Sequence, residues 1–263
     1  MKYGLVVRNV TDLRAKPKFH SERRSQILFN EFVRMGNIVN GYCHICQSDG
    51  YQGWVDIRAL KALPEKNHKF KPDCLINTPV CHLKSGSLGS TANLPFIFYG
   101  TSMKLSNIRG TTAIVADWRG NEYRVSRGQI SPVGKSGQLA GKGRQIVTEA
   151  GRFIGTPYLW GGITSFGIDC SGLVQMVYRS IGKHLPRDSS QQRKTGRKVN
   201  LEAVKSGDLF FFKGHVAIAI DKYRMIHSSL GSGGVYYNSM NPHDPDYRSD
   251  LADIFIEARR VLK

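Results

Sequence analysis

The chain has 263 residues and a mass of 29.4 kDa, with 38 Lys and Arg against 20 Asp and Glu and a net charge of +18 at pH 7. This length exceeds one small barrel and suits two or three compact units, and a hydrophobic content of 40% excludes wholesale disorder. No apolar run reaches the roughly 18 residues that a membrane-spanning helix needs, so we expect no membrane span. The positive charge favours anionic partners without identifying them.

The start of the chain does not look like a secretion signal, because its apolar run ends at Arg8. We therefore expect a cytoplasmic protein, although a leader removed earlier would place it in the periplasm or outside the cell. Five cysteines are an odd number and far too few for a disulfide scaffold.

Residues 1–63 read as short apolar segments separated by polar turns every 8–12 residues or so, a pattern typical of a small β-barrel. A polar linker follows from Pro64 to Lys69. Residues 64–136 then show a similar pattern of short strands, although no strict repeat is visible in the sequence. We expect two small barrels, over residues 1–63 and 64–136.

Residues 137–263 have a different character. Apolar residues recur every three to four positions between 146 and 154, which predicts a helix, and a second helix is predicted from Ser171 to Ile181, ended by Gly182. The strands that we expect afterwards are 208–212, 216–220, 225–228, 235–238 and 254–258. Helices followed by a run of strands predict an α+β domain with an antiparallel sheet.

Cys170 lies where the second helix should begin. The first turn of a helix carries unpaired backbone N–H groups and a partial positive charge, which favour a thiolate and could hold an oxyanion. The alternative is a buried structural cysteine, a common environment for a free thiol.

Two histidines change that balance. His215 begins an alternating strand and His227 lies in the next one, so the rings share a face only if the hairpin loop contains an odd number of residues. In that register Cys170 would be a nucleophile, His215 its base and His227 the group that fixes the tautomer of the base. A two-residue loop would separate the rings.

A series of ordered motifs in the second half resembles the NlpC family of papain-like cysteine peptidases. These motifs are Thr156 to Gly162, Asp169 to Val174, Pro186 to Gln192, Gly207 to Phe212, His215 to Ile218 and Ile226 to Ser229. The first half resembles the bacterial SH3-like barrels that precede such domains, through Val10 to Pro17 and Gly50 to Val55, and the second barrel matches less well. The resemblance implies a papain-like catalytic domain over residues 137–263.

The resemblance also implies an activity, which is hydrolysis of the γ-D-glutamyl–L-diamino acid bond in peptidoglycan stem peptides that carry a free N-terminal L-Ala. It implies that Tyr158, Asp169 and Ser171 line the substrate site and that an acidic residue of a barrel helps to bind the amine, with Glu31 and Asp56 as candidates. Asp169 suits a substrate ammonium and suits a helix N-cap equally well.

No cofactor is implied. The partner that we expect is a peptidoglycan-derived peptide, and we expect the protein to be a monomer. Two other functions stay open at this point. One is an acyltransferase or amidase on the same thiol, and the other is a non-catalytic protein that binds the cell wall.

Cys43 and Cys46 have the spacing of a metal-binding or redox pair, and Cys74 and Cys81 might seem to complete a zinc site. The second pair is spaced seven apart and falls in the other predicted barrel, so we expect no metal and interpret these residues as alternating strand positions.

The basic residues carry no aromatic–basic recognition motif, so we expect no nucleic-acid partner. We interpret the cluster Arg187, Arg193, Lys194, Arg197 and Lys198 as a solvated surface. Composition alone favours a core position for Trp160.

Overall fold

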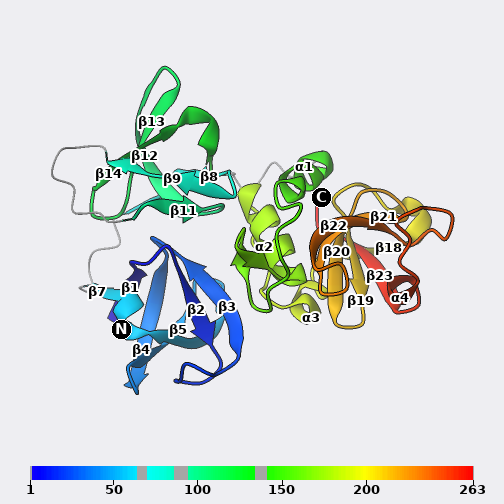
Figure 1. Ribbon diagram of the computed structural model, residues 1–263, viewed down its shortest axis with the longest axis horizontal. Helices are drawn as coiled ribbons and strands as arrows, with labels where there is room; N and C mark the ends of the chain where they lie inside the picture. Colours follow the sequence, from blue (N-terminus) through cyan, green and yellow to red (C-terminus); the bar gives the residue numbers. More distant parts are fainter. Residues whose placement is uncertain (1, 64–69, 86–93, 134–140, 263) are drawn as a thin grey trace. The chain divides into compact units, whose positions relative to one another are not determined.

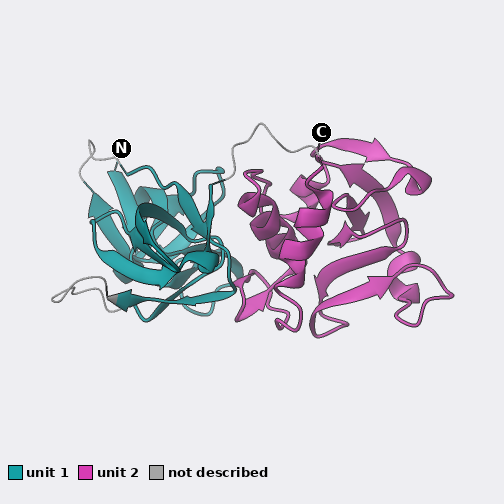
Figure 2. Cartoon of the chain, turned by 90° about the horizontal axis from the view of Figure 1, so that it is seen from above, with its two compact units in different colours: residues 1–133 teal, residues 134–263 magenta. Residues whose placement is uncertain are grey.

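The computed structural model describes residues 2–63, 70–85, 94–133 and 141–262. The chain forms two compact units, residues 1–133 and 134–263, coloured separately in Figure 2. No helix among the described residues is long and apolar enough to cross a membrane. The linker predicted at 64–69 and the boundary predicted at 136/137 lie outside the described residues.

Residues 2–63 form an antiparallel seven-stranded sheet in the order β3-β2-β6-β5-β4-β1-β7 (Figure 1). Its elements are β1 (Lys2–Val6), β2 (Val10–Arg14), β3 (Arg23–Leu28), β4 (Phe32–Val39), β5 (Tyr42–Cys46), β6 (Gln52–Asp56), the 3-10 helix η1 (Ile57–Ala59) and β7 (Leu60–Leu63). Side chains alternate between the two faces, so Cys43 and Ile45 of β5 are buried in the barrel core while His44 and Cys46 lie on the other face. This confirms the predicted strand alternation at Cys43 and Cys46.

The described residues from 70 to 133 form a six-stranded sheet, β10-β14-β13-β12-β8-β15, and a two-stranded sheet, β11-β9. Their elements are β8 (Cys74–Ile76), β9 (Val80–His82), β10 (Lys84–Ser85), β11 (Phe96–Phe98), β12 (Ser102–Arg109), β13 (Thr112–Ala116), β14 (Glu122–Ser126), the 3-10 helix η2 (Arg127–Gln129) and β15 (Ile130–Pro132). Cys74 and Cys81 lie in the core of this second barrel.

The second barrel repeats the first with a shift of 70 residues along the chain. β12 starts 70 residues after β4, and the same shift relates β13 to β5, β14 to β6 and η2 to η1. A backbone turn with positive φ recurs too, at Asn30 (69°) and Gly100 (80°). The repeat is hard to see in the sequence because a barrel restricts the residue type only at its inward-facing positions and in its turns.

The two barrels share buried contacts. Phe29 of the first barrel lies within the hydrophobic core of the second. Next to it, the side chain of Asn30 is only 2% exposed, and its amide donates to the carbonyl of Ser102 at 2.7 Å and accepts from the backbone N–H of Trp118 at 3.1 Å. Residues 1–133 are therefore one unit in packing as well as in chain order.

The second unit has an antiparallel six-stranded sheet in the order β18-β23-β19-β20-β21-β22 within residues 141–262. Its strands are β18 (Arg197–Val199), β19 (Leu209–Phe212), β20 (His215–Ala219), β21 (Arg224–Ser229), β22 (Gly234–Ser239) and β23 (Phe255–Arg260), with a separate hairpin of β16 (Ile163–Thr164) and β17 (Gly167–Ile168). The helical elements are α1 (Gly143–Gly151), α2 (Cys170–Ser180), α3 (Ser189–Gln192), η3 (Leu201–Ala203) and α4 (Ser249–Ala252).

Helix α2 packs against β20 and β21 and also contacts α1, and Figure 1 shows α1 and α2 side by side next to this sheet. The apolar residues Leu173, Val174 and Val177 recur at helical spacing along α2, and all three are buried. Both predicted helices form, each within a few residues of the expected bounds. The fold is the α+β class predicted, a papain-like catalytic domain preceded by two SH3-like barrels.

Candidate active site

The start of α2 is fixed by the carboxylate of Asp169, the N-cap residue. Oδ1 accepts a hydrogen bond from the N–H of Gly172 at 2.7 Å and Oδ2 accepts from the N–H of Gly161 at 2.8 Å. The helix and the preceding loop approach closely here, since a Cβ atom on Gly172 would lie 2.4 Å from the carbonyl oxygen of Gly162. The N-cap hydrogen bonds and this close approach fix where α2 begins, so Cys170 is held at its first position.

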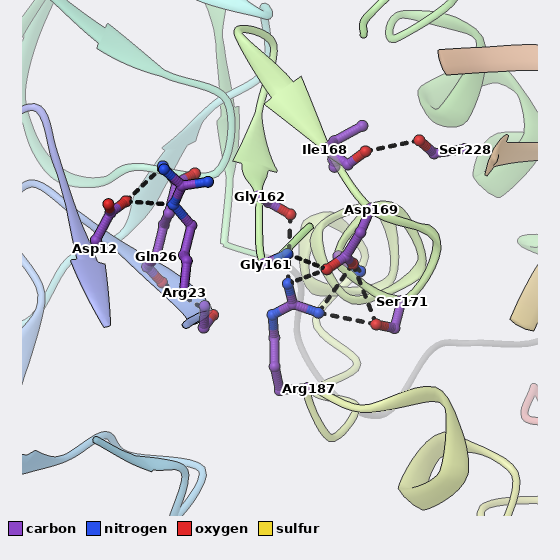
Figure 3. Close-up of polar contacts among 12 residues, drawn as sticks. Asp12, Arg23, Gln26, Gly161, Gly162, Ile168, Asp169, Ser171, Arg187 and Ser228 are labelled. Atoms are coloured by element: carbon purple, nitrogen blue, oxygen red, sulfur yellow. Dashed lines mark hydrogen bonds and ion pairs between the residues drawn. The ribbon is translucent and has the colours of Figure 1, made fainter. Parts of the chain in front are cut away.

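The same carboxylate forms a buried ion pair with Arg187, marked by dashed lines in Figure 3. Nη2 of Arg187 lies 2.6 Å from Oδ2 of Asp169, and Nη1 lies 3.0 Å from Oδ1 and 2.8 Å from Oγ of Ser171. Arg187 is only 2% exposed, so the prediction that it belongs to a solvated basic surface is wrong. Paired with a carboxylate, the guanidinium can be buried where a free cation could not.

The predicted substrate residues gather around this ion pair. Asp169 is the N-cap, as one of its two predicted roles requires, and its binding of a substrate ammonium stays a prediction. The hydroxyl of Ser171 donates to Oδ1 of Asp169 at 3.2 Å and accepts from Arg187.

Tyr158 is half-buried near Cys170 and Asp169. Burial, followed by the charges that these two groups carry when ionised, raises the pKa of its phenol to about 12. It therefore stays protonated and able to donate a hydrogen bond. Trp160 lies in a turn and is 59% exposed, so the core position that composition favours is wrong.

Cys170 is 8% exposed, and its sulfur accepts hydrogen bonds from the backbone N–H groups of Ser171 and Val216. The second contact places the sulfur against the start of β20, next to His215. Burial, followed by the charge of Asp169, raises the pKa of Cys170 to about 11, and the two N–H groups and Arg187 oppose this only in part. Desolvation therefore acts against the thiolate that the helix terminus is expected to favour.

The hairpin of β20 and β21 has the register that brings the two histidines together. Ile218 pairs with Ile226, and Ile220 bonds to Arg224, so residues 221–223 form a loop of odd length. The rings of His215 and His227 share a face, diagonal to each other, with Nε2 of His215 2.7 Å from Nδ1 of His227.

Burial sets the protonation of both rings. It lowers the pKa of His215 to about 3, with the neighbouring His227 adding to the effect, and it lowers the pKa of His227 to about 4. Both imidazoles are therefore neutral near pH 7. With Cys170 protonated, the site at rest combines a neutral thiol on α2 with a neutral imidazole at the start of β20, and a neutral imidazole can accept a proton.

Two further residues of this site were not predicted as functional. Arg187 was placed on the surface, and Asn238, which lies 2.9 Å from Nε2 of His227 through Oδ1, was seen only as the end of a predicted strand. The motif Pro186 to Gln192 carried a signal for Arg187, because the Arg follows a Pro in a matched segment. No local pattern marks Asn238, whose role depends on strand pairing.

Of the acidic candidates in the first barrel, Asp56 caps η1 and forms a 2.6 Å ion pair with Arg58, and Glu31 is half-buried. Of the other cysteines, Cys43 lies in the core of the first barrel, Cys46 on the opposite face of the same strand, and Cys74 and Cys81 in the core of the second barrel. Burial raises the pKa of Cys74 to about 12 and that of Cys81 to about 11. Across the part of the chain that the structure describes, no group of three His, Cys, Asp or Glu side chains is arranged to hold a metal ion.

Comparison with known proteins agrees with this geometry. Residues 155–249 match the NlpC/P60 family, and residues 13–60 match the bacterial dipeptidyl-peptidase Sh3 domain. The chain is 40% identical to dipeptidyl-peptidase 6 of Lysinibacillus sphaericus, over 95% of this chain and 96% of that protein. It is 32% identical to a γ-D-glutamyl-L-lysine dipeptidyl-peptidase of Bacillus subtilis (strain 168), over 68% of this chain and 60% of that protein.

The fold is shared along its whole length with a crystal structure of an NlpC/P60 family protein from Bacillus cereus ATCC 10987. The TM-score is 0.86, the identity is 21%, and the match covers 99% of this chain and 100% of that one. Similarity across both barrels and the catalytic domain, at 40% identity to a relative of the same length, shows that the chain belongs to the NlpC/P60 family of cysteine peptidases.

Proposed function

We propose that this peptidase hydrolyses the γ-D-glutamyl–L-diamino acid bond of peptidoglycan stem peptides, and that it prefers peptides with a free N-terminal L-Ala. The relatives named above support the bond, because one is a γ-D-glutamyl-L-lysine dipeptidyl-peptidase, and both names describe release of a dipeptide. A dipeptidyl-peptidase must recognise a free amine two residues from the bond that it cuts.

In this proposal Cys170 is the nucleophile and His215 is its base. As the sulfur attacks the γ-carbonyl carbon, the thiol proton moves to His215, and the positive end of α2 favours the oxyanion that develops. His215 then returns the proton to the leaving amine of the diamino acid. Water, deprotonated by the same imidazole, hydrolyses the thioester and frees the dipeptide.

The observation that carries the proposal is the 2.7 Å contact between His215 and His227. His215 lies on β20, and the backbone N–H of the next residue, Val216, donates a hydrogen bond to the sulfur of Cys170. These contacts support the proposal that three side chains from α2, β20 and β21 act as a nucleophile, a base and a group that orients the base. Tyr158, Asp169 and Ser171 would line the substrate side, and the field of a strongly basic chain would attract an acidic peptide.

We further propose that residues 1–63, 64–136 and 137–263 are the three domains, and that the protein acts as a monomer without nucleic acid. Size-exclusion chromatography with light scattering would give the mass in solution, for which we expect about the 29.4 kDa of one chain. A dimer would contradict the proposed monomer.

The activity is tested with L-Ala-γ-D-Glu-L-Lys and its meso-diaminopimelate counterpart, followed by mass spectrometry. We expect release of L-Ala-D-Glu and the free diamino acid, and no release when the L-Ala amine is acetylated. An absence of cleavage, with acyl transfer to added hydroxylamine, would instead indicate an acyltransferase. Equal cleavage of acetylated and free peptides would remove the proposed preference for a free amine.

A further inference from the structure

His227, the second histidine of the site, is itself held by a polar network. Oδ1 of Asn238, on β22, lies 2.9 Å from Nε2 of His227 and 3.1 Å from Oγ of Ser232. Oγ of Ser232 lies 2.6 Å from Nη1 of Arg248 and 3.0 Å from Oγ of Ser229. These contacts lie behind His227, on the side away from His215.

Groups that can only donate or only accept fix the direction of the hydrogen bonds that reach His227. The amide Nδ2 of Asn238 donates to the backbone carbonyl of Asp246 at 3.2 Å, so the amide must turn its oxygen towards His227. A flipped amide would place two oxygens against each other. Arg248 can only donate, so the hydroxyl of Ser232 accepts a hydrogen bond from it and donates its own hydrogen bond to Oδ1 of Asn238.

The tautomers of both histidines follow from that oxygen. Because Oδ1 of Asn238 accepts, Nε2 of His227 must carry a proton, and the neutral ring then has a bare Nδ1. That bare nitrogen accepts from Nε2–H of His215, which leaves Nδ1 of His215 without a proton. The polarity is the same after His215 has taken a proton, because Nε2–H still donates to His227.

We infer that Asn238, held by Ser232 and Arg248, is a positioning residue that keeps the basic lone pair of the site on Nδ1 of His215. The inference rests on the proposed role of His215 as the base for Cys170. The network acts on the base through His227. Charged groups also act on both rings, Arg248 against their protonation and Asp250 in favour of it.

The first experiment needs no substrate. In the full-length protein labelled with ¹⁵N-histidine, long-range ¹H–¹⁵N correlation spectra near pH 7 report which ring nitrogen carries the proton, with signals assigned through His215→Gln and His227→Gln. We expect both rings of the wild type to be protonated at Nε2 alone. A proton on Nδ1 of His227 overturns the inference, whether or not the protein cleaves the proposed peptides.

The second experiment compares two leucine substitutions by their kinetics. Asn238→Leu removes the acceptor, so we expect mixed tautomers, kcat lower by about 10- to 100-fold and a KM within about 3-fold of the wild type. Asn241→Leu is the matched control, because Asn241 lies in the next loop and its side chain bonds to Asp244 and His243 rather than to a histidine ring of the site. Its kinetics should equal those of the wild type.

A carboxylate separates positioning from simple packing. In Asn238→Asp an acceptor again faces Nε2–H of His227, and its negative charge should raise the pKa of His227 and move the acid limb of kcat upward by about one pH unit or more. We expect activity between those of the wild type and Asn238→Leu. If Asn238→Leu keeps the wild-type tautomers and kcat while the wild type cleaves the peptide, the inference fails and the proposed function stands.

Discussion

The second unit holds two polar clusters that are built on opposite principles. On the side of the α2 terminus, Asp169 and Arg187 form a fully charged, bidentate ion pair buried at 6% and 2% exposure. On the side of the sheet, His215, His227 and Asn238 are joined by hydrogen bonds without a charge. A fixed charge pair holds backbone in place, whereas a group that must move a proton has to remain neutral and directional.

Removing the sulfur of Cys170 should have the largest effect. Cys170→Ala deletes the proposed nucleophile, and we expect kcat/KM for the L-Ala-γ-D-Glu-L-Lys peptide to fall by about 10⁴-fold or more. Cys46→Ala is the control, since Cys46 lies in the first barrel on the face away from its core. Turnover that survives in Cys170→Ala would exclude a thiol mechanism.

Breaking the charged cluster should cost stability. Arg187→Met leaves the carboxylate of Asp169 buried without its cation, and we expect the free energy of unfolding to fall by about 3–5 kcal/mol in urea titrations. Arg193→Met breaks an ion pair with Glu257 at 3.0 Å in which the Arg is 43% exposed, so its cost should be about 0–1 kcal/mol. Equal costs for the two variants would show that the Asp169–Arg187 pair has no special weight.

The neutral state of the two histidines should determine how kcat/KM depends on pH. Burial lowers the pKa values of His227 and His215 from 6.5 to about 4 and about 3, so the proposed base stays unprotonated well into acid. We expect kcat/KM to be level from pH 8 to about 5 and to fall only as the pH approaches 4. An acid limb near pH 6.5 or above would instead indicate an ion pair of thiolate and imidazolium.

The same shifts predict how stability depends on pH. Between pH 6.5 and about 3 the unfolded chain binds protons that the folded histidines refuse, so the folded state loses stability as the pH falls through that window. The melting temperature should fall less steeply over this range in His227→Gln than in the wild type. Parallel melting curves for the two proteins would contradict the burial of a neutral His227.

The smallest effect is expected at the substrate side of the charged cluster. Tyr158→Phe removes one hydroxyl that stays protonated because the pKa of Tyr158 is about 12. We expect KM to rise by about 3- to 10-fold with little change in kcat, as for the loss of a single neutral hydrogen bond to substrate. A large fall in kcat with KM unchanged would assign Tyr158 to the transition state instead.

Local sequence patterns predict much of the secondary structure but fewer of the contacts between elements. Apolar spacing and a following glycine predicted α2 within one residue at each end, and alternation predicted the strand that starts near His215. The hairpin register could not be chosen from sequence, because a loop of three residues and a loop of two differ only in how the backbone turns. The pairing of Arg187 with Asp169 joins residues 18 positions apart and depends on tertiary folding.

The insertion of Phe29 into the core of the second barrel, sealed by Asn30, limits how the first unit can be rearranged. A chimera that replaced only one barrel would leave the ring of Phe29 without the core in which it packs, and the amide of Asn30 without its hydrogen bonds to the backbone of Ser102 and Trp118. Recombination among relatives is therefore expected to exchange both barrels as a single cassette, and the useful junction for such engineering lies after residue 133 rather than after residue 63.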